Sequence, residues 1–134
     1  MVSKLRSERI AERIHDELSS ILLLDVSDPR VEPAYITQVR VDRELAYATI
    51  YISALEGSQR ADEILEGLNH ARGYLRTKLT RRIPLRSFPR LRFVWDQSME
   101  QADRIDQLLA SLDDGTEDSE RSISEELDEF EQNG

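Results

Sequence analysis

The chain has 134 residues and no cysteine, so one small domain is expected, and disulfides, thiolate zinc sites and cysteine nucleophiles are excluded. Its net charge of −9 arises after Leu112, where ten acids accompany one base, since residues 1–112 carry 17 bases and 17 acids. No apolar run approaches the roughly 20 residues that span a bilayer, and the charged N-terminus has no apolar signal core, so a soluble, cytoplasmic protein is expected.

The first predicted element is an amphipathic helix over about 4–24. Aliphatic residues from Ile10 to Leu22 recur there at spacings of three and four, which places them on one stripe. The turn residues Ser27-Asp28-Pro29 follow, and a proline disfavours helical backbone just before it. The helix is therefore expected to end near Asp25.

Two strands are predicted next, over about 35–41 and 45–54, joined by a short link that favours an antiparallel hairpin. Strict alternation would place Tyr35, Thr37, Val39 and Val41 on one face of the first strand. In the second strand, the aliphatic set that is expected to face the core is Ala48, Ile50 and Ile52.

The second half of the chain predicts a helix over about 60–70 and a further apolar stripe from Leu75 to Ile83. Gly73 stands between them, and glycine costs a helix about 1 kcal/mol relative to alanine, so a kink or short break is expected there. A third strand over about 90–96 and a last helix up to Leu112 follow. Three strands with helices on one face make a two-layer α+β domain over 1–112. The acidic, serine-rich residues 113–134 predict a disordered tail.

A run of eight bases without any acid lies between residues 72 and 92. A block of one sign within an otherwise neutral body attracts polyanions, and arginine adds bidentate contacts to phosphate. The alternative interpretation is a solvated charged face. The bases are Arg72, Arg76, Lys78, Arg81, Arg82, Arg86, Arg90 and Arg92.

The predicted kink at residues 69–74 resembles the nucleic-acid-binding element of a KH domain, in which a GXXG loop between two helices clamps RNA backbone. Here Ala71 stands in place of a glycine, and one residue separates it from Gly73. The alternative interpretation is an ordinary glycine at a helix end.

An alanine–any–glycine element in this place is similar to that of the ribosome-binding factor A family. The resemblance covers about residues 6–112 and departs from the family at Ala102, where a glycine is usual, and in the loop 31–34. The other segments that carry it are Asp28-Pro29-Arg30, Leu45-Ala46-Tyr47-Ala48, Ile50-Tyr51-Ile52-Ser53, Arg86 to Ser98, and Arg104-Ile105-Asp106.

The resemblance implies a type-II KH-like fold and a non-enzymatic assembly factor. Such factors bind the immature small (30S) ribosomal subunit and 16S rRNA, assist late rRNA processing, and matter most in the cold. A monomer without metal or cofactor is expected, and assembly GTPases are candidate partners. Carried over by position, the RNA contacts are Ala71, Arg72, Gly73, Arg76 and Lys78. The charge run adds Arg81, Arg82, Arg86, Arg90 and Arg92.

Further candidates come with alternatives. Arg6, Arg9 and Arg13 could extend the RNA contact, although interleaved acids equally predict a salt-bridged surface. His70 borders the kink. Tyr47 and Tyr51 could stack bases on the sheet or could simply favour a strand. The acidic tail could cover the basic run or serve solubility alone. A protein-interaction module without direct RNA binding is the second functional hypothesis.

Overall fold

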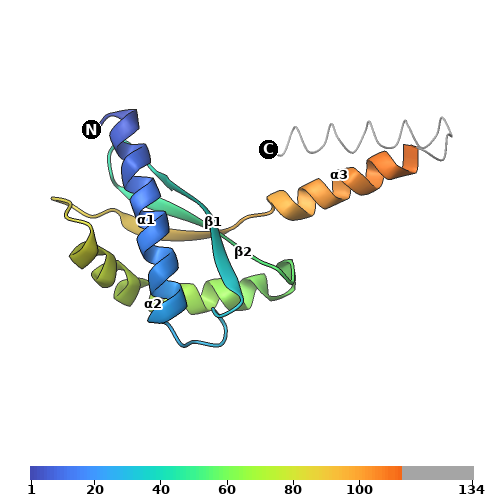
Figure 1. Cartoon of the computed structure of the whole chain (residues 1–134), viewed down its shortest axis with the longest axis horizontal. Coiled ribbons are helices and arrows are strands. Elements are labelled where there is room, and N and C mark those ends of the chain that lie inside the picture. Colours follow the sequence, from blue (N-terminus) through green and yellow to red (C-terminus); the bar gives the residue numbers. More distant parts are fainter. Residues whose placement is uncertain (113–134) are drawn as a thin grey trace. The chain divides into compact units, whose positions relative to one another are not determined.

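The computed structural model describes residues 1–112 (Figure 1). It contains a three-stranded sheet and three α-helices, in the order that the sequence predicts except that one helix stands where two are expected. The elements are α1 (Lys4–Leu24), β1 (Ala34–Val41), β2 (Tyr47–Ala54), the short 3₁₀ helix η1 (Ser58–Arg60), α2 (Ala61–Arg82), β3 (Arg90–Trp95) and α3 (Ser98–Leu112).

Helix α1 has the predicted bounds because both ends are capped. The Ser3 side chain accepts a hydrogen bond from the Arg6 amide at 3.1 Å, which satisfies one of the free N–H groups of the first turn. At the other end, the Asp25 amide donates to the Ile21 carbonyl at 2.8 Å. The predicted apolar stripe is buried at Ile10, Ile14, Leu18 and Ile21.

The sheet has the order β1-β2-β3. Strands β1 and β2 form the predicted antiparallel hairpin, whereas β3 pairs with β2 in parallel, and α2 is the crossover between them. Ala48, Ile50 and Ile52 are fully buried, as predicted for the core face of β2.

The predicted strict alternation in β1 is wrong. The register shifts between Ile36 and Gln38, so Thr37 is an extra residue in this strand. Because of this extra residue, side chains before and after the bulge no longer alternate between the two faces of the sheet with a single period of two. Ile36 is therefore buried on the core face together with the half-buried Val39 and Val41, while Tyr35 and Thr37 are exposed.

Of the predicted kink or short break at Gly73, the break is wrong, because α2 is helical without interruption from Ala61 to Arg82. Figure 1 shows its ribbon changing direction between the green first part and the olive second part, so the helix bends without breaking. One cause is visible in the hydrogen bonds. The Thr77 hydroxyl donates to the Gly73 carbonyl at 2.9 Å, one turn back, and such bonds bend helices.

Helices α1 and α2 pack on one face of the sheet, and a single hydrophobic core lies between the two layers. Helix α1 contacts β1, and α2 contacts β3. From α2 the core receives Ile64, Leu68, Leu75 and Leu79, all fully buried. The predicted two-layer α+β fold is confirmed.

The chain divides into two compact units, Met1–Asp96 and Gln97–Gly134. The described part of the second unit is α3, in which no residue is fully buried. The hydrophobic core lies within the first of these units. The expected acidic tail lies outside the described residues.

Candidate nucleic-acid interface

The basic run is distributed over three places in the structure. Its first part lies on the second half of α2, Arg86 lies in the loop that follows, and Arg90 and Arg92 lie on β3. All of these cations keep some exposure to solvent. Their partners differ, so each place has its own electrostatic character.

Arg76 holds the loop before β3. Its guanidinium donates from Nη2 to the Phe88 carbonyl at 2.8 Å and from Nε to the Pro89 carbonyl at 3.4 Å. It also lies 5.9 Å from the centre of the Phe88 ring. These contacts occupy N–H groups that could otherwise donate to a phosphate. Arg76 therefore stabilises the loop at the start of β3.

Lys78 and Arg82 face acidic residues of α1 and its C-terminal cap. Lys78 Nζ lies 3.5 Å from an Asp25 carboxylate oxygen, and Arg82 lies 3.4 Å from the same oxygen and 3.2 Å from Glu17. In addition, Arg13 donates to the Arg82 carbonyl at 3.0 Å. These acids therefore neutralise this part of the basic run and join the ends of the two helices.

Five members of the run are exposed without an ion pair or side-chain hydrogen bond among residues 1–112, and three of them lie outside the sheet. These three are Arg72 and Arg81 on α2 and Arg86 in the loop. On α1, the side chains of Arg6 and Arg9 are exposed in the same way, whereas Arg13 is bound to Arg82. Arg72, Arg81 and Arg86 are hereafter the free arginines. His70, also exposed, lies on α2 one turn before Gly73 and Tyr74.

Two glycines of α2 differ in what surrounds them. A Cβ atom at Gly67 would lie 2.8 Å from Val31 Cγ2 and 3.2 Å from Arg30 Cβ. Packing of α2 against the loop between α1 and β1 therefore requires glycine there. A Cβ atom at Gly73 would meet no atom within 4 Å, and its φ is not positive. Neither packing nor backbone conformation therefore explains Gly73, whereas close approach by a ligand would. Its neighbour Ala71 is half-buried against the core.

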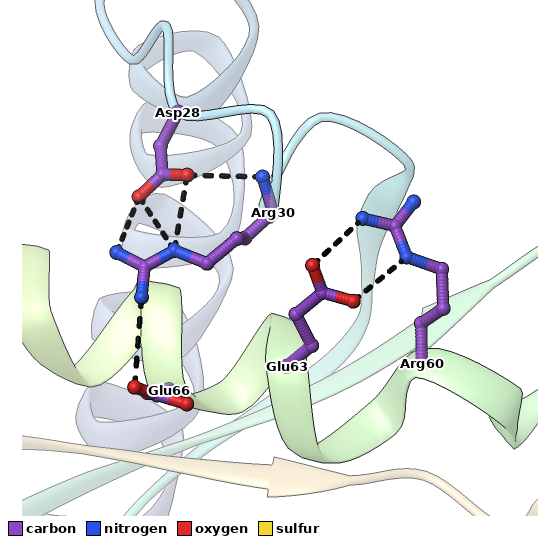
Figure 2. A network of polar contacts seen from close by, with 5 residues as sticks. All are labelled: Asp28, Arg30, Arg60, Glu63 and Glu66. Atoms are coloured by element: carbon purple, nitrogen blue, oxygen red, sulfur yellow. Dashed lines mark hydrogen bonds and ion pairs between the residues drawn. The ribbon is translucent and has the colours of Figure 1, made fainter.

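Asp28 and Arg30 fix the loop that covers Gly67. Figure 2 shows the Arg30 guanidinium between Asp28 and Glu66; Arg30 Nη2 donates to Asp28 at 2.8 Å, and Nη1 lies 3.7 Å from Glu66. The hydrogen bonds from Arg30 lower the pKa of the Asp28 carboxyl, and the same partnership raises the pKa of the Arg30 guanidinium. A second pair in Figure 2 joins Arg60 to Glu63 at 3.1 Å and lowers the pKa of Glu63.

The last two bases of the run lie on the face of the sheet opposite the core, here called the open face. Arg90 and Arg92 alternate there with the buried Leu91 and Phe93. Arg92 lies over the ring of Tyr47, 4.1 Å from its centre. Arg40 of β1 lies 5.9 Å from the centre of the Tyr51 ring. Sequence reasoning missed Arg40, because only the strand register brings it beside Tyr51.

Residues 1–112 show neither a group of metal ligands nor a membrane-spanning helix. They contain no group of three or more histidine, aspartate or glutamate side chains placed to hold a metal ion. None of their helices is both long enough and apolar enough to cross a membrane. The arrangement can bind a polyanion through cations and exposed backbone.

The fold and this surface define a small, two-layer α+β protein with exposed arginines along its crossover helix. A family model described as Ribosome-binding factor A matches residues 6–109. The chain belongs to the ribosome-binding factor A family, as the resemblance at 71–73 had implied. A relative from Aromatoleum aromaticum, named Ribosome-binding factor A, is 38% identical over 104 residues, which are 78% of this chain and 82% of that protein.

Two solved structures share the fold. The crystal structure of ribosome-binding factor A from Thermus thermophilus is 22% identical, with a TM-score of 0.62 over 69% of this chain and 97% of that one. A homology model of the Thermus thermophilus factor, fitted into a cryo-electron-microscopy map of a 30S complex, is 24% identical. Its TM-score is 0.53, over 65% of this chain and 91% of that one.

Proposed function

We propose that this protein binds the small ribosomal subunit during its assembly and contacts 16S rRNA through the second half of α2. The observation that carries the proposal is the exposed Gly73 on α2, with Arg72 before it and Arg81 and Arg86 after it in the sequence. The chain that carries these residues belongs to this family. The 30S complex of the Thermus thermophilus relative supports the subunit as the partner.

The contact uses phosphates more than bases. Each arginine that neutralises a phosphate releases condensed counterions, which contributes affinity that falls with salt. Gly73 lets the RNA backbone approach the helix where a side chain would stand in the way. Phosphate contacts position a protein without reading sequence, so specificity comes from the shape of the folded rRNA.

The function requires binding and no chemical step, because the residues that carry it are cations and a glycine. Binding to one arrangement of a flexible rRNA segment shifts the subunit toward that arrangement, in proportion to the difference in affinity. We further propose that this shift assists late 16S rRNA processing and matters most in the cold, when misfolded rRNA rearranges slowly. The protein would act as a cytoplasmic monomer, released with the help of an assembly GTPase.

Co-sedimentation with ribosomal particles on sucrose gradients tests the proposal. The informative variant is Arg72→Glu/Arg81→Glu, because neither side chain has a structural partner among the described residues. The charge-matched control is Lys4→Glu/Arg43→Glu, which alters two exposed cations outside α2; of these, Arg43 donates one hydrogen bond, to the Val2 carbonyl at 3.0 Å. Changes at Arg76, Lys78 or Arg82 would be ambiguous, since these residues also hold the fold together.

We expect the wild type and the control to sediment with the small subunit and the α2 variant to stay at the top of the gradient. Wild-type protein that sediments with no particle would end the assembly-factor proposal. An α2 variant that sediments like the wild type would move the contact away from this helix. For an RNA contact, the slope of log affinity against log salt concentration is about −0.7 to −0.9 for each phosphate bound. A contact mediated by protein would show a weaker dependence of affinity on salt.

A further inference from the structure

The open face of the sheet carries a grid of arginine and tyrosine side chains. On β2 the outward residues are Tyr47, Thr49 and Tyr51, and they pair in the sheet register with Arg90, Arg92 and Val94 of β3. On the other side, Arg40 of β1 is the partner of Thr49. Cations therefore flank the aromatic strand on both sides.

The two tyrosines and two of the arginines are in contact diagonally across the strands. Arg92 lies 4.1 Å from the centre of the Tyr47 ring, a stacking distance, and Arg40 lies 5.9 Å from the centre of the Tyr51 ring. A ring holds a guanidinium in place without using its N–H donors. Both guanidiniums are thus positioned and still able to bind a phosphate or a base edge.

No acid neutralises this grid among the described residues. Arg40, Arg90 and Arg92 form no ion pair there. Two acids lie at strand ends: Asp42 accepts from the Tyr47 amide at 2.8 Å, and Asp96 accepts from the Thr37 hydroxyl, and neither forms an ion pair with these three arginines. The open face therefore presents three arginines without an ion pair among residues 1–112, although this part of the chain as a whole is neutral.

Within the unit Met1–Asp96, helices α1 and α2 pack against the other face of the sheet and leave this one to its own side chains. Tyr47 is 39% exposed, Arg40, Arg90 and Arg92 are exposed, and Tyr51 is half-buried. Tyrosine favours strands in its own right, but that preference does not account for three arginines beside the two rings that form no ion pair within the described part of the chain. The combination points to a ligand with both negative charge and flat rings.

We propose that the open face binds single-stranded RNA, with Arg40, Arg90 and Arg92 on phosphates and the rings of Tyr47 and Tyr51 beside unpaired bases. Aromatic platforms within a basic surface are the usual means of holding a single strand, since every base has a flat face to stack. A duplex hides those faces inside its own stack. This surface is separate from α2, so the protein would hold folded rRNA on its crossover helix and an unpaired segment on its sheet.

Fluorescence anisotropy with labelled twelve-nucleotide oligouridine and a twelve-base-pair RNA duplex tests the proposal on the full chain. The variant Arg40→Gln/Arg92→Gln removes two cations from the face, and Lys4→Gln/Arg43→Gln removes two from elsewhere. Tyr51→Ile removes a ring while it keeps a good strand former, and Tyr51→Phe keeps the ring. Circular dichroism melting checks that each variant is folded.

For the single strand we expect Tyr51→Ile to lose about tenfold in affinity and Tyr51→Phe to bind as the wild type does. The arginine variant should reduce the slope of log affinity against log salt by about 1.4, for two lost phosphate contacts, and the control should not. Duplex affinity should be unaffected by Tyr51→Ile.

Single-strand binding that is equal in the wild type, Tyr51→Ile and the arginine variant would overturn the proposal and leave the face to a protein partner. Equal losses for duplex and single strand would also overturn it, because stacking would then have no part. The inference extends the proposed RNA function but fails separately from it. Arg72→Glu/Arg81→Glu tests the subunit contact, whereas the sheet variants test single-strand binding.

Discussion

Replacing Gly73 by alanine should stabilise the protein and weaken its binding to the ribosomal subunit. Gly73 lies inside a helix of 22 residues, where glycine is about 1 kcal/mol less favourable than alanine. A methyl group there meets no atom within 4 Å, so no steric cost offsets the gain. The free energy of unfolding should therefore rise by about 1 kcal/mol.

For a compact unit of this size, 1 kcal/mol corresponds to a melting temperature higher by about 4–8 °C. Urea unfolding followed by circular dichroism should show a higher midpoint at an unchanged slope. If the RNA backbone approaches Gly73, the same methyl group occupies its place. A loss of about tenfold in affinity, or about 1.4 kcal/mol, is then expected for the small subunit.

Gly67→Ala is the matched control, because it makes the same substitution in the same helix. Its new methyl group would lie 2.8 Å from Val31 Cγ2, so it should destabilise the protein by about 1–3 kcal/mol. The folded fraction should bind the subunit as the wild type does. A stabilised Gly73→Ala protein with unchanged subunit affinity would refute the interface role of Gly73, and a destabilised one would refute the reasoning about its surroundings.

Two further predictions concern the polar contacts that hold the fold. Arg76→Ala should lower the free energy of unfolding by about 1–2 kcal/mol in a urea titration, because the carbonyls of Phe88 and Pro89 lose a charged donor. Asp28→Asn should flatten the acid dependence of stability. The pKa of Asp28 is lower in the folded than in the unfolded chain, so its pairing with Arg30 stabilises fully above the unfolded pKa. That contribution is lost as the pH falls through the folded pKa, below about pH 4. Urea midpoints between pH 2 and pH 7 measure the difference.

Both predictions have a clear contrary result. If Arg76→Ala unfolds at the wild-type urea midpoint but loses subunit binding, Arg76 contacts RNA and its carbonyl bonds contribute little. If Asp28→Asn shows the same fall in stability below about pH 4 as the wild type, other carboxylates cause that fall. Glu63 is the first to examine, since its pKa is lowered by Arg60.

Elements with strong periodicity were predicted well. The apolar stripe of α1 and the alternation of Ala48, Ile50 and Ile52 in β2 each depend on one buried face. The residues that are buried in the structure follow the regular spacing of apolar residues in the sequence. The bulge at Thr37 was not predictable in the same way, because an extra residue in a strand leaves no mark on composition. Only pairing with β2 reveals it.

The helix through Gly73 shows the limit of local preference. Glycine predicts a kink or short break there, but Leu75 and Leu79 on one side and Ile64 and Leu68 on the other are all fully buried. Burial of four large side chains on one continuous helix outweighs a local cost of about 1 kcal/mol. The helix still bends, and the Thr77 hydroxyl donates a hydrogen bond to the Gly73 carbonyl in this part of it.

The sequence by itself determined the order of the elements, the neutral body with its single block of cations, and the family to which the chain is similar. Only the tertiary structure decided which cations are available. Lys78 and Arg82 meet acids at the end of α1 that lie more than fifty residues away in the chain, whereas Arg72 and Arg81 do not. It also distinguished Gly67, which packing requires, from Gly73, which packing does not require. The physical reason is that charge pairing, register and close packing depend on distances between remote segments, which periodicity and composition do not contain.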